Sequence, residues 1–132
     1  MSDGWETARR MDRPDVIEAN DDGTLKVTGR EWAVFKLGFP GKIKQICVDS
    51  NHFKGNYPDS VKIEGAYLGR ADWCPETITE WENILKPNKL SAHKEHWFDC
   101  ASDTITHIRV TMAPDGGFSR IRALGYVDTE SL

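Results

Sequence analysis

The sequence has no long apolar run, no excess of basic charge and no apolar leader segment. No stretch approaches the roughly 18 apolar residues that a membrane span needs, and the opening MSDGWETARR is polar throughout. The formal net charge is −4 and the pI is near 5.5, so no basic field is present to attract phosphate backbones. We therefore expect a cytoplasmic protein that binds neither nucleic acid nor a membrane.

Cysteine is also scarce. Cys47, Cys74 and Cys100 are odd in number, widely spaced and never arranged as C-x-x-C. This pattern argues against a disulfide framework and against a zinc knuckle. We expect three free thiols that pack like small apolar side chains.

No long amphipathic helix is apparent, so the crossovers of a parallel α/β fold have nothing to form them. Short β-type segments alternate instead with turns rich in Gly, Pro, Asn and Asp. The expected strands are 30–37, 43–50, 60–67, 96–100, 105–112 and 119–126. The 132 residues suit one domain, 1–132, with a core of ordinary size. The sequence predicts an all-β antiparallel sandwich, a jelly roll.

Other segments have less certain structure. Residues 75–85 fit either a short helix or an irregular strand-turn insert, closed by a turn at 86–88. Residues 38–41 (GFPG) predict a turn between two strands, and PDGG at 114–117 is compatible with a plain hairpin.

The segment HFKGNYP, residues 52–58, carries unusual chemistry for a loop after a buried strand. His52 has a side chain that titrates near neutrality, and Lys54 and Asn56 can donate hydrogen bonds to an oxygen-rich ligand. Gly55 would let the backbone turn with positive φ or pass close to another group. A rigid surface loop is the alternative, because Asn-Tyr-Pro is also good turn chemistry.

Three further clusters stand out, and each has a plain structural alternative. DGWETARR at 3–10 combines carboxylates and guanidiniums, or is a solvated arm. Arg120 and Arg122 share one strand face and suit a carboxylate, or line a solvated face. His107 and Arg109 also share a face. No metal-ligand, Walker or nucleophile-elbow motif is present. The residues indicate a small anionic ligand on a β scaffold and do not name a reaction.

Taken together and in this order, the segments resemble allantoicase. The resemblance rests on DGWET at 3–7, WAVFKLG at 32–38, HFKGNYP at 52–58, IEG at 63–65, THIR at 106–109 and PDGGFSRIR at 114–122. It covers about residues 3–126.

The resemblance implies a jelly roll of the galactose-binding-like kind and the hydrolysis of allantoate to ureidoglycolate and urea in purine degradation. Familiar members of the family contain two repeats, and this chain resembles one. Two alternatives remain open: a non-catalytic ligand-binding module, and a half-domain that needs a second repeat. Self-association as a two-fold dimer is a further expectation, through exposed aromatic residues among Trp5, Trp32, Phe53, Tyr57 and Phe118.

Allantoate carries one carboxylate and two ureido groups, so its site needs guanidinium, amide-like groups and an acid. The resemblance implies the catalytic candidates His52, Glu6, Asp49 and Glu64. It implies the substrate-binding candidates Lys54, Asn56, Arg9, Arg109, Asp115, Arg120 and Arg122. No cofactor is certain. A divalent metal held by His52 with Asp49 or Glu64 is an open alternative, although the spacing is no recognised ligand set.

Overall fold

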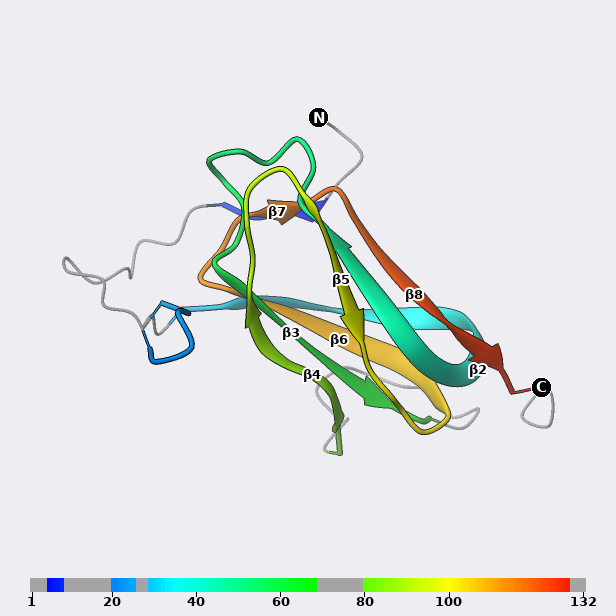
Figure 1. Cartoon of the computed structure of the whole chain (residues 1–132). Coiled ribbons are helices and arrows are strands. Elements are labelled where there is room, and N and C mark those ends of the chain that lie inside the picture. Colours follow the sequence, from blue (N-terminus) through cyan, green and yellow to red (C-terminus); the bar gives the residue numbers. More distant parts are fainter. Residues whose placement is uncertain (1–4, 9–19, 26–28, 69–79, 129–132) are drawn as a thin grey trace.

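A computed structural model of the chain describes residues 5–8, 20–25, 29–68 and 80–128, which form an all-β structure of antiparallel strands. The strands are β1 (Trp5–Glu6), β2 (Glu31–Asp49), β3 (Ser60–Ala66), β4 (Glu82–Lys89), β5 (Glu95–Asp99), β6 (Ile105–Ala113), β7 (Gly117–Phe118) and β8 (Arg120–Val127). Two layers result, as Figure 1 shows. The predicted antiparallel β-sandwich of jelly-roll type is confirmed.

β2 belongs to both layers. Its first part, Glu31–Lys36, pairs with β6, and this layer continues through β3 to β4. Its second part pairs with β5 on one side and with β8 on the other. Residues 38–41, where a turn between two strands was expected, belong to this one strand, which bends sharply here with a register shift between Lys36 and Gly41. Figure 1 shows the second half of β2 turning back from the end of the first half.

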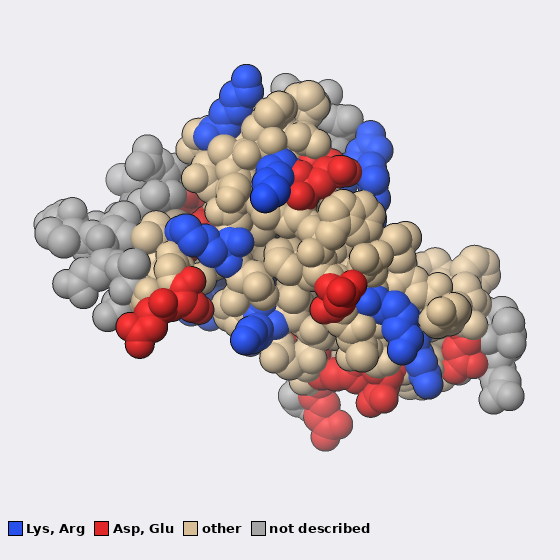
Figure 2. Space-filling view, viewed as in Figure 1, with Lys and Arg blue, Asp and Glu red and all other residues tan. Residues whose placement is uncertain are grey.

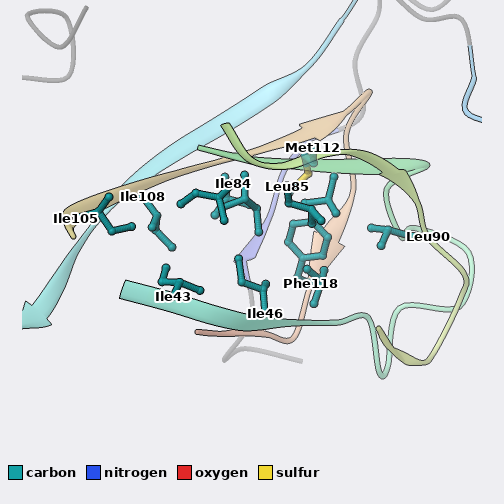
Figure 3. Packing of buried hydrophobic residues seen from close by; sticks show 13 residues of the cluster. Ile43, Ile46, Ile84, Leu85, Leu90, Ile105, Ile108, Met112 and Phe118 are labelled. Carbon is teal, nitrogen blue, oxygen red and sulfur yellow. The ribbon is translucent and has the colours of Figure 1, made fainter. Parts of the chain in front are cut away.

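The core lies between the two layers. Figure 3 shows Ile43 and Ile46 on β2 facing Ile105, Ile108 and Met112 on β6. Other members of the core cluster are Val48, Val61, Ile63, Ile84, Leu85, Leu90, Val110 and Phe118. Each such side chain contributes about 1.5–3 kcal/mol by leaving water. The side chains that the predicted alternation placed on one side of residues 105–112, namely Ile108, Val110 and Met112, thus form the inner face of β6.

β4 decides between the two alternatives for residues 75–85 as far as they are described. The described part of the ambiguous segment is a strand, not a helix, while residues 75–79 lie outside the described residues. The predicted turn at 86–88 is also wrong. Leu85 pairs with Ile63 and Asn88 with Val61, so β4 carries one extra residue here, a bulge. Pro87 fits this place because a bulge in an edge strand needs no N–H donor.

The PDGG segment does not form a plain hairpin. β6 ends at Ala113 in one layer, whereas β8 pairs with β2 in the other layer. Residues 114–119 therefore cross from one layer to the other. On the way, β7 pairs with β1, with Trp5 opposite Phe118.

Charges of both signs are mixed on the surface. Figure 2 shows Lys and Arg interspersed with Asp and Glu over the visible face, with no continuous basic patch among its described residues. None of the described residues belongs to a helix long and apolar enough to cross a membrane.

The two described cysteines are free thiols that burial protects. Cys47 is fully buried and Cys100 is half-buried, and neither is in a disulfide. Burial raises the pKa of both thiols, and the carboxylates of Glu95 and Asp49 add to the rise at Cys47. Because the thiolate is the reactive form, the folded protein slows modification at both sites.

We predict that thiol titration of the denatured protein without reductant finds three free sulfhydryls, one of them from Cys74, which lies outside the described residues. In the folded protein at neutral pH, Cys47 should be alkylated far more slowly than after denaturation, because it is buried and protonated. Peptide mapping of timed alkylation measures this difference. Fewer than three thiols, or equal rates at Cys47 in both states, would contradict the prediction.

Candidate functional site

Three segments that are far apart in the sequence meet at one end of the sandwich, the upper end in Figure 1. They are β1 with Thr7, the loop after β2, and the PDGG segment leading into β7. The Thr7 N–H donates to the Gly116 carbonyl (2.9 Å), and the Gly116 N–H donates to the Thr7 hydroxyl (3.1 Å). The Gly117 N–H donates to the Asn56 carbonyl (2.9 Å). The described part of DGWET, residues 5–7, thus forms one structural unit with HFKGNYP and PDGG.

Two glycines make this meeting possible. A Cβ on Gly116 would lie 2.6 Å from the Asn56 carbonyl oxygen, and the residue has a φ of 131°. A Cβ on Gly117 would lie 2.3 Å from the ring of Phe53, which is buried. Neither position accepts a side chain without displacing backbone or a packed ring.

We predict that Gly116→Ala lowers the free energy of unfolding by about 1–3 kcal/mol, because both the space and the backbone conformation exclude a Cβ. Gly55→Ala is the matched control, since nothing lies within 4 Å of a Cβ there. Urea unfolding of the two variants measures the difference. Equal stabilities would show that the close approach is not required.

Glu6 and Asn56 present polar groups at this end. The Asn56 side-chain amide donates to Glu6 Oε1 over 2.8 Å, and both residues are exposed. Because both residues are exposed, both side chains are in contact with solvent. A carboxylate and an amide are thereby held side by side, in a form that a small polar ligand can reach.

Asp49 and His52 follow the end of β2, but their surroundings differ. Asp49 is buried, its carboxylate accepts the Asn51 N–H (2.8 Å), and its carbonyl accepts from both the N–H and the hydroxyl of Ser119. It therefore holds the loop to the start of β8. His52 has a φ of 73°, and its N–H donates to Nδ1 of His93 (2.7 Å). The His52 ring is directed toward the loop before β5, 5.7 Å from the His93 ring.

A cavity of about 420 Å³ opens beside the three-segment unit, between the first half of β2 and β8. Its lining includes Trp5 and Phe118 from the unit and Phe35 from β2, which give it apolar walls. Lys36, Ser119 and Arg120 add two cations and a hydroxyl. An apolar cavity with a few polar groups is the usual form of a small-molecule site, and these cations favour an anion.

The structure separates Arg120 from Arg122. Both lie on β8, but Arg120 lines the cavity, whereas Arg122 Nη1 lies 3.6 Å from a carboxylate oxygen of Glu95 on the outer surface. The pair reaches diagonally across β2, because Glu95 is opposite Asp49 on one side of that strand and Arg122 is opposite Cys47 on the other.

Glu64 and Arg109 lie elsewhere, on the outer face of the layer formed by β3 and β6. They are opposite each other in register, and Arg109 donates to Glu64 Oε1 from Nε (3.0 Å) and Nη2 (2.8 Å). The guanidinium also lies over the ring of Trp81, 4.5 Å from its centre. These contacts account for both side chains as a structural ion pair.

Three of the candidate site residues remain: Lys54, Asp115 and Arg9. Lys54 is exposed in the HFKGNYP loop, and Asp115 is buried next to Gly116 in the three-segment unit. Arg9 lies outside the described residues. Within the described ranges, no group of three or more His, Cys, Asp or Glu residues is placed to hold a metal ion.

His107 lies on the same outer face as Arg109 and is buried. Its pKa is lowered from the ordinary 6.5, mainly by burial and further by the nearby charge of Lys36. The unfolded chain therefore binds this proton at higher pH than the folded chain does. The stability associated with neutral His107 is present above pH 6.5 and is lost as the pH falls through the lowered pKa.

We predict that His107→Gln weakens the loss of stability on acidification below pH 6.5, because it removes this titration. Urea unfolding of the two proteins above and below that pH measures the slope. Identical pH dependence in both proteins would contradict a neutral buried His107.

Sequence reasoning did not identify the cavity residues Lys36 and Ser119, nor a second cavity of about 490 Å³. The second cavity lies where Asn20–Leu25 passes over β3 and β6, and Arg30, Lys62 and Thr111 line it. No sequence pattern marks either cavity, because segments that are far apart in the sequence line each of them.

An antiparallel β-sandwich with this topology defines a jelly-roll protein. The chain belongs to the allantoicase family, since the family model for one allantoicase repeat matches residues 1–128. A probable allantoicase of Pseudomonas fluorescens is 44% identical over 132 residues, 96% of this chain and 35% of the relative. A probable allantoicase of Stutzerimonas stutzeri is 42% identical over the same shares. The chain thus spans about a third of the length of these curated relatives.

Solved structures also match the fold of this chain. The allantoicase of Saccharomyces cerevisiae matches with a TM-score of 0.71 and 33% identity, over 96% of this chain and 32% of that chain. Chitosan-binding module 1 of a chitosanase/glucanase from Paenibacillus sp. IK-5 matches with a TM-score of 0.55 and 15% identity, over 74% of this chain and 70% of that chain. The second likeness concerns the fold alone.

Proposed function

We propose that this chain forms part of an enzyme that hydrolyses allantoate to ureidoglycolate and urea in purine degradation. Family membership gives the reaction class, because the relatives are named as allantoicases. The observation that carries the proposal for this chain is the cavity with Arg120 beside the unit of Glu6, Asn56 and Gly116.

In this proposal Arg120 binds the carboxylate of allantoate. Its guanidinium can form two parallel hydrogen bonds to a carboxylate, and the apolar walls from Trp5 and Phe118 strengthen such a contact by lowering the local dielectric. The cavity volume of about 420 Å³ suits a small molecule.

Glu6 is the proposed base that activates water. It is exposed and its carboxylate is oriented by Asn56, whereas Asp49 is buried and engaged with Asn51, and Glu64 is engaged with Arg109. His52 is the proposed acid for the departing nitrogen, because its ring is exposed at the same end of the sandwich. Asn56 and Lys54 supply donors for the ureido groups.

The second candidate function is a half-domain whose site is completed by another repeat. It is favoured by the length of the relatives, of which this chain covers about 35%, and by the open cavity at the edge of the sandwich. Urea release from allantoate by this chain, with and without a chelator, separates the candidates. Activity at any protein concentration supports a complete site, and activity lost on dilution supports a shared one.

We predict that Arg120→Ala weakens allantoate binding by tens to hundreds of fold, which corresponds to about 2–4 kcal/mol for a charge-assisted bidentate contact. Arg122→Ala is the matched control, since it removes the same group two residues along the strand, from the pair with Glu95. Calorimetric titration measures both affinities, and circular dichroism checks the fold. Equal affinities for the two variants would refute the role of Arg120.

A further inference from the structure

The exposed edges of the sandwich are not equally protected against pairing with another strand. β4 carries Lys86, Pro87 and Lys89 and contains the bulge, and β5 has carboxylates at Glu95 and Asp99. Charges, proline and bulges are the usual devices that keep an edge strand from pairing. Among the described strands, β4 and β5 therefore have protected edges.

β8 differs from these two strands. Within the described residues it pairs only with β2, so its other edge has no strand partner. Its charged residues, Arg120 and Arg122, are confined to its start, and Ala123–Val127 carries no charge and no proline. Leu124, Tyr126 and Val127 are 47%, 70% and 54% exposed. An exposed, uncharged and apolar edge of this kind is a template for pairing.

The apolar surface continues from β8 onto the bend of β2. A shallow cavity of about 240 Å³ is lined by Phe39 and Pro40 from the bend and by Tyr126 and Val127 from β8. Phe35 and Phe39, 43% and 60% exposed, extend the surface to the mouth of the Arg120 cavity. By contrast, two aromatic residues expected at an interface, Phe53 and Phe118, are buried in the monomer. These two rings pack beneath the three-segment unit, whereas Trp32, from the same set of expected residues, is 52% exposed.

We propose that the free edge of β8 binds the same edge of a second copy of this chain, in antiparallel register about a two-fold axis at Leu124. A two-fold axis between two identical edge strands requires them to run antiparallel. With Leu124 opposite the partner's Leu124, Arg122 lies opposite the partner's Tyr126 and Arg120 opposite the partner's Asp128. This register brings opposite charges together at both ends of the pair. Registers centred on Ile121 would instead place Arg120 opposite the partner's Arg122, which like charges disfavour.

The pairing also covers the mouth of the Arg120 cavity. Gly41 pairs with Ile105 of β6 and with Val127 of β8, so β6 and β8 lie on opposite sides of β2. The unpaired side of the first half of β2 therefore faces the same way as β8. The cavity opens between these two edges, so a second copy seated on β8 closes it. The proposal does not depend on the proposed reaction, because the oligomeric state is measured without substrate.

Sedimentation over a dilution series tests the association directly. The unmodified chain should be a dimer that dissociates on dilution, and Leu124→Lys should be monomeric, because two ammonium groups would meet at the axis. Tyr67→Lys is the matched control. Tyr67 is 54% exposed but follows β3, which does not pair with β8, so this variant should stay dimeric. An unmodified chain that is monomeric throughout, or a Leu124→Lys variant that dimerises like the unmodified chain, overturns the proposal.

Cross-linking tests the register and covers the case in which Leu124→Lys fails to fold. Directly opposed residues of an antiparallel pair have Cα atoms about 4.5–5.5 Å apart, within reach of a disulfide. In a background with Cys74→Ser and Cys100→Ser, Leu124→Cys should form a covalent dimer on mild oxidation, and Tyr67→Cys should not. A dimer by sedimentation that Leu124→Cys does not cross-link, or equal cross-linking of both variants, refutes this register.

Discussion

The passage of one continuous strand from one layer to the other determines the rest of this structure. β2 runs from Glu31 to Asp49 and pairs with β6, β5 and β8 in turn. Because each pairing fixes the register of a neighbour, the bend between Lys36 and Gly41 sets the angle between the layers and the width of the core between them. The same bend separates the first half of β2 from β8, and the Arg120 cavity opens in that separation.

The end of the sandwich where the three segments meet depends on backbone contacts more than on side chains. Gly116 and Gly117 let the crossing segment lie against the loop that carries Asn56 and Phe53, and the hydrogen bonds to Thr7 then fix β1 beside it. Polar side chains such as Glu6 and Asn56 are consequently presented by a rigid scaffold. A scaffold of this kind reduces the entropy that a ligand-binding loop would otherwise lose on binding.

Ion pairs account for much of the charge that looked functional in the sequence. Glu64 and Arg109 form a cross-strand pair, and Glu95 and Arg122 form a pair that reaches across β2, in line with the mixture of signs seen in Figure 2. Arg120 differs because it lines a cavity with apolar walls. Chemical type alone could not distinguish it from Arg122, since both are arginines on one strand.

The sequence by itself determined the β class, most strand positions and the family, because period-two alternation and turn residues are local properties and the motifs are specific. It also identified the three segments that meet at the end of the sandwich. Only the tertiary structure decided that residues 38–41 bend one strand, that Pro87 lies in a bulge and that PDGG crosses between layers. It also decided which arginine reaches a cavity. These features depend on pairing between residues dozens of positions apart, and local patterns do not encode which strands become neighbours.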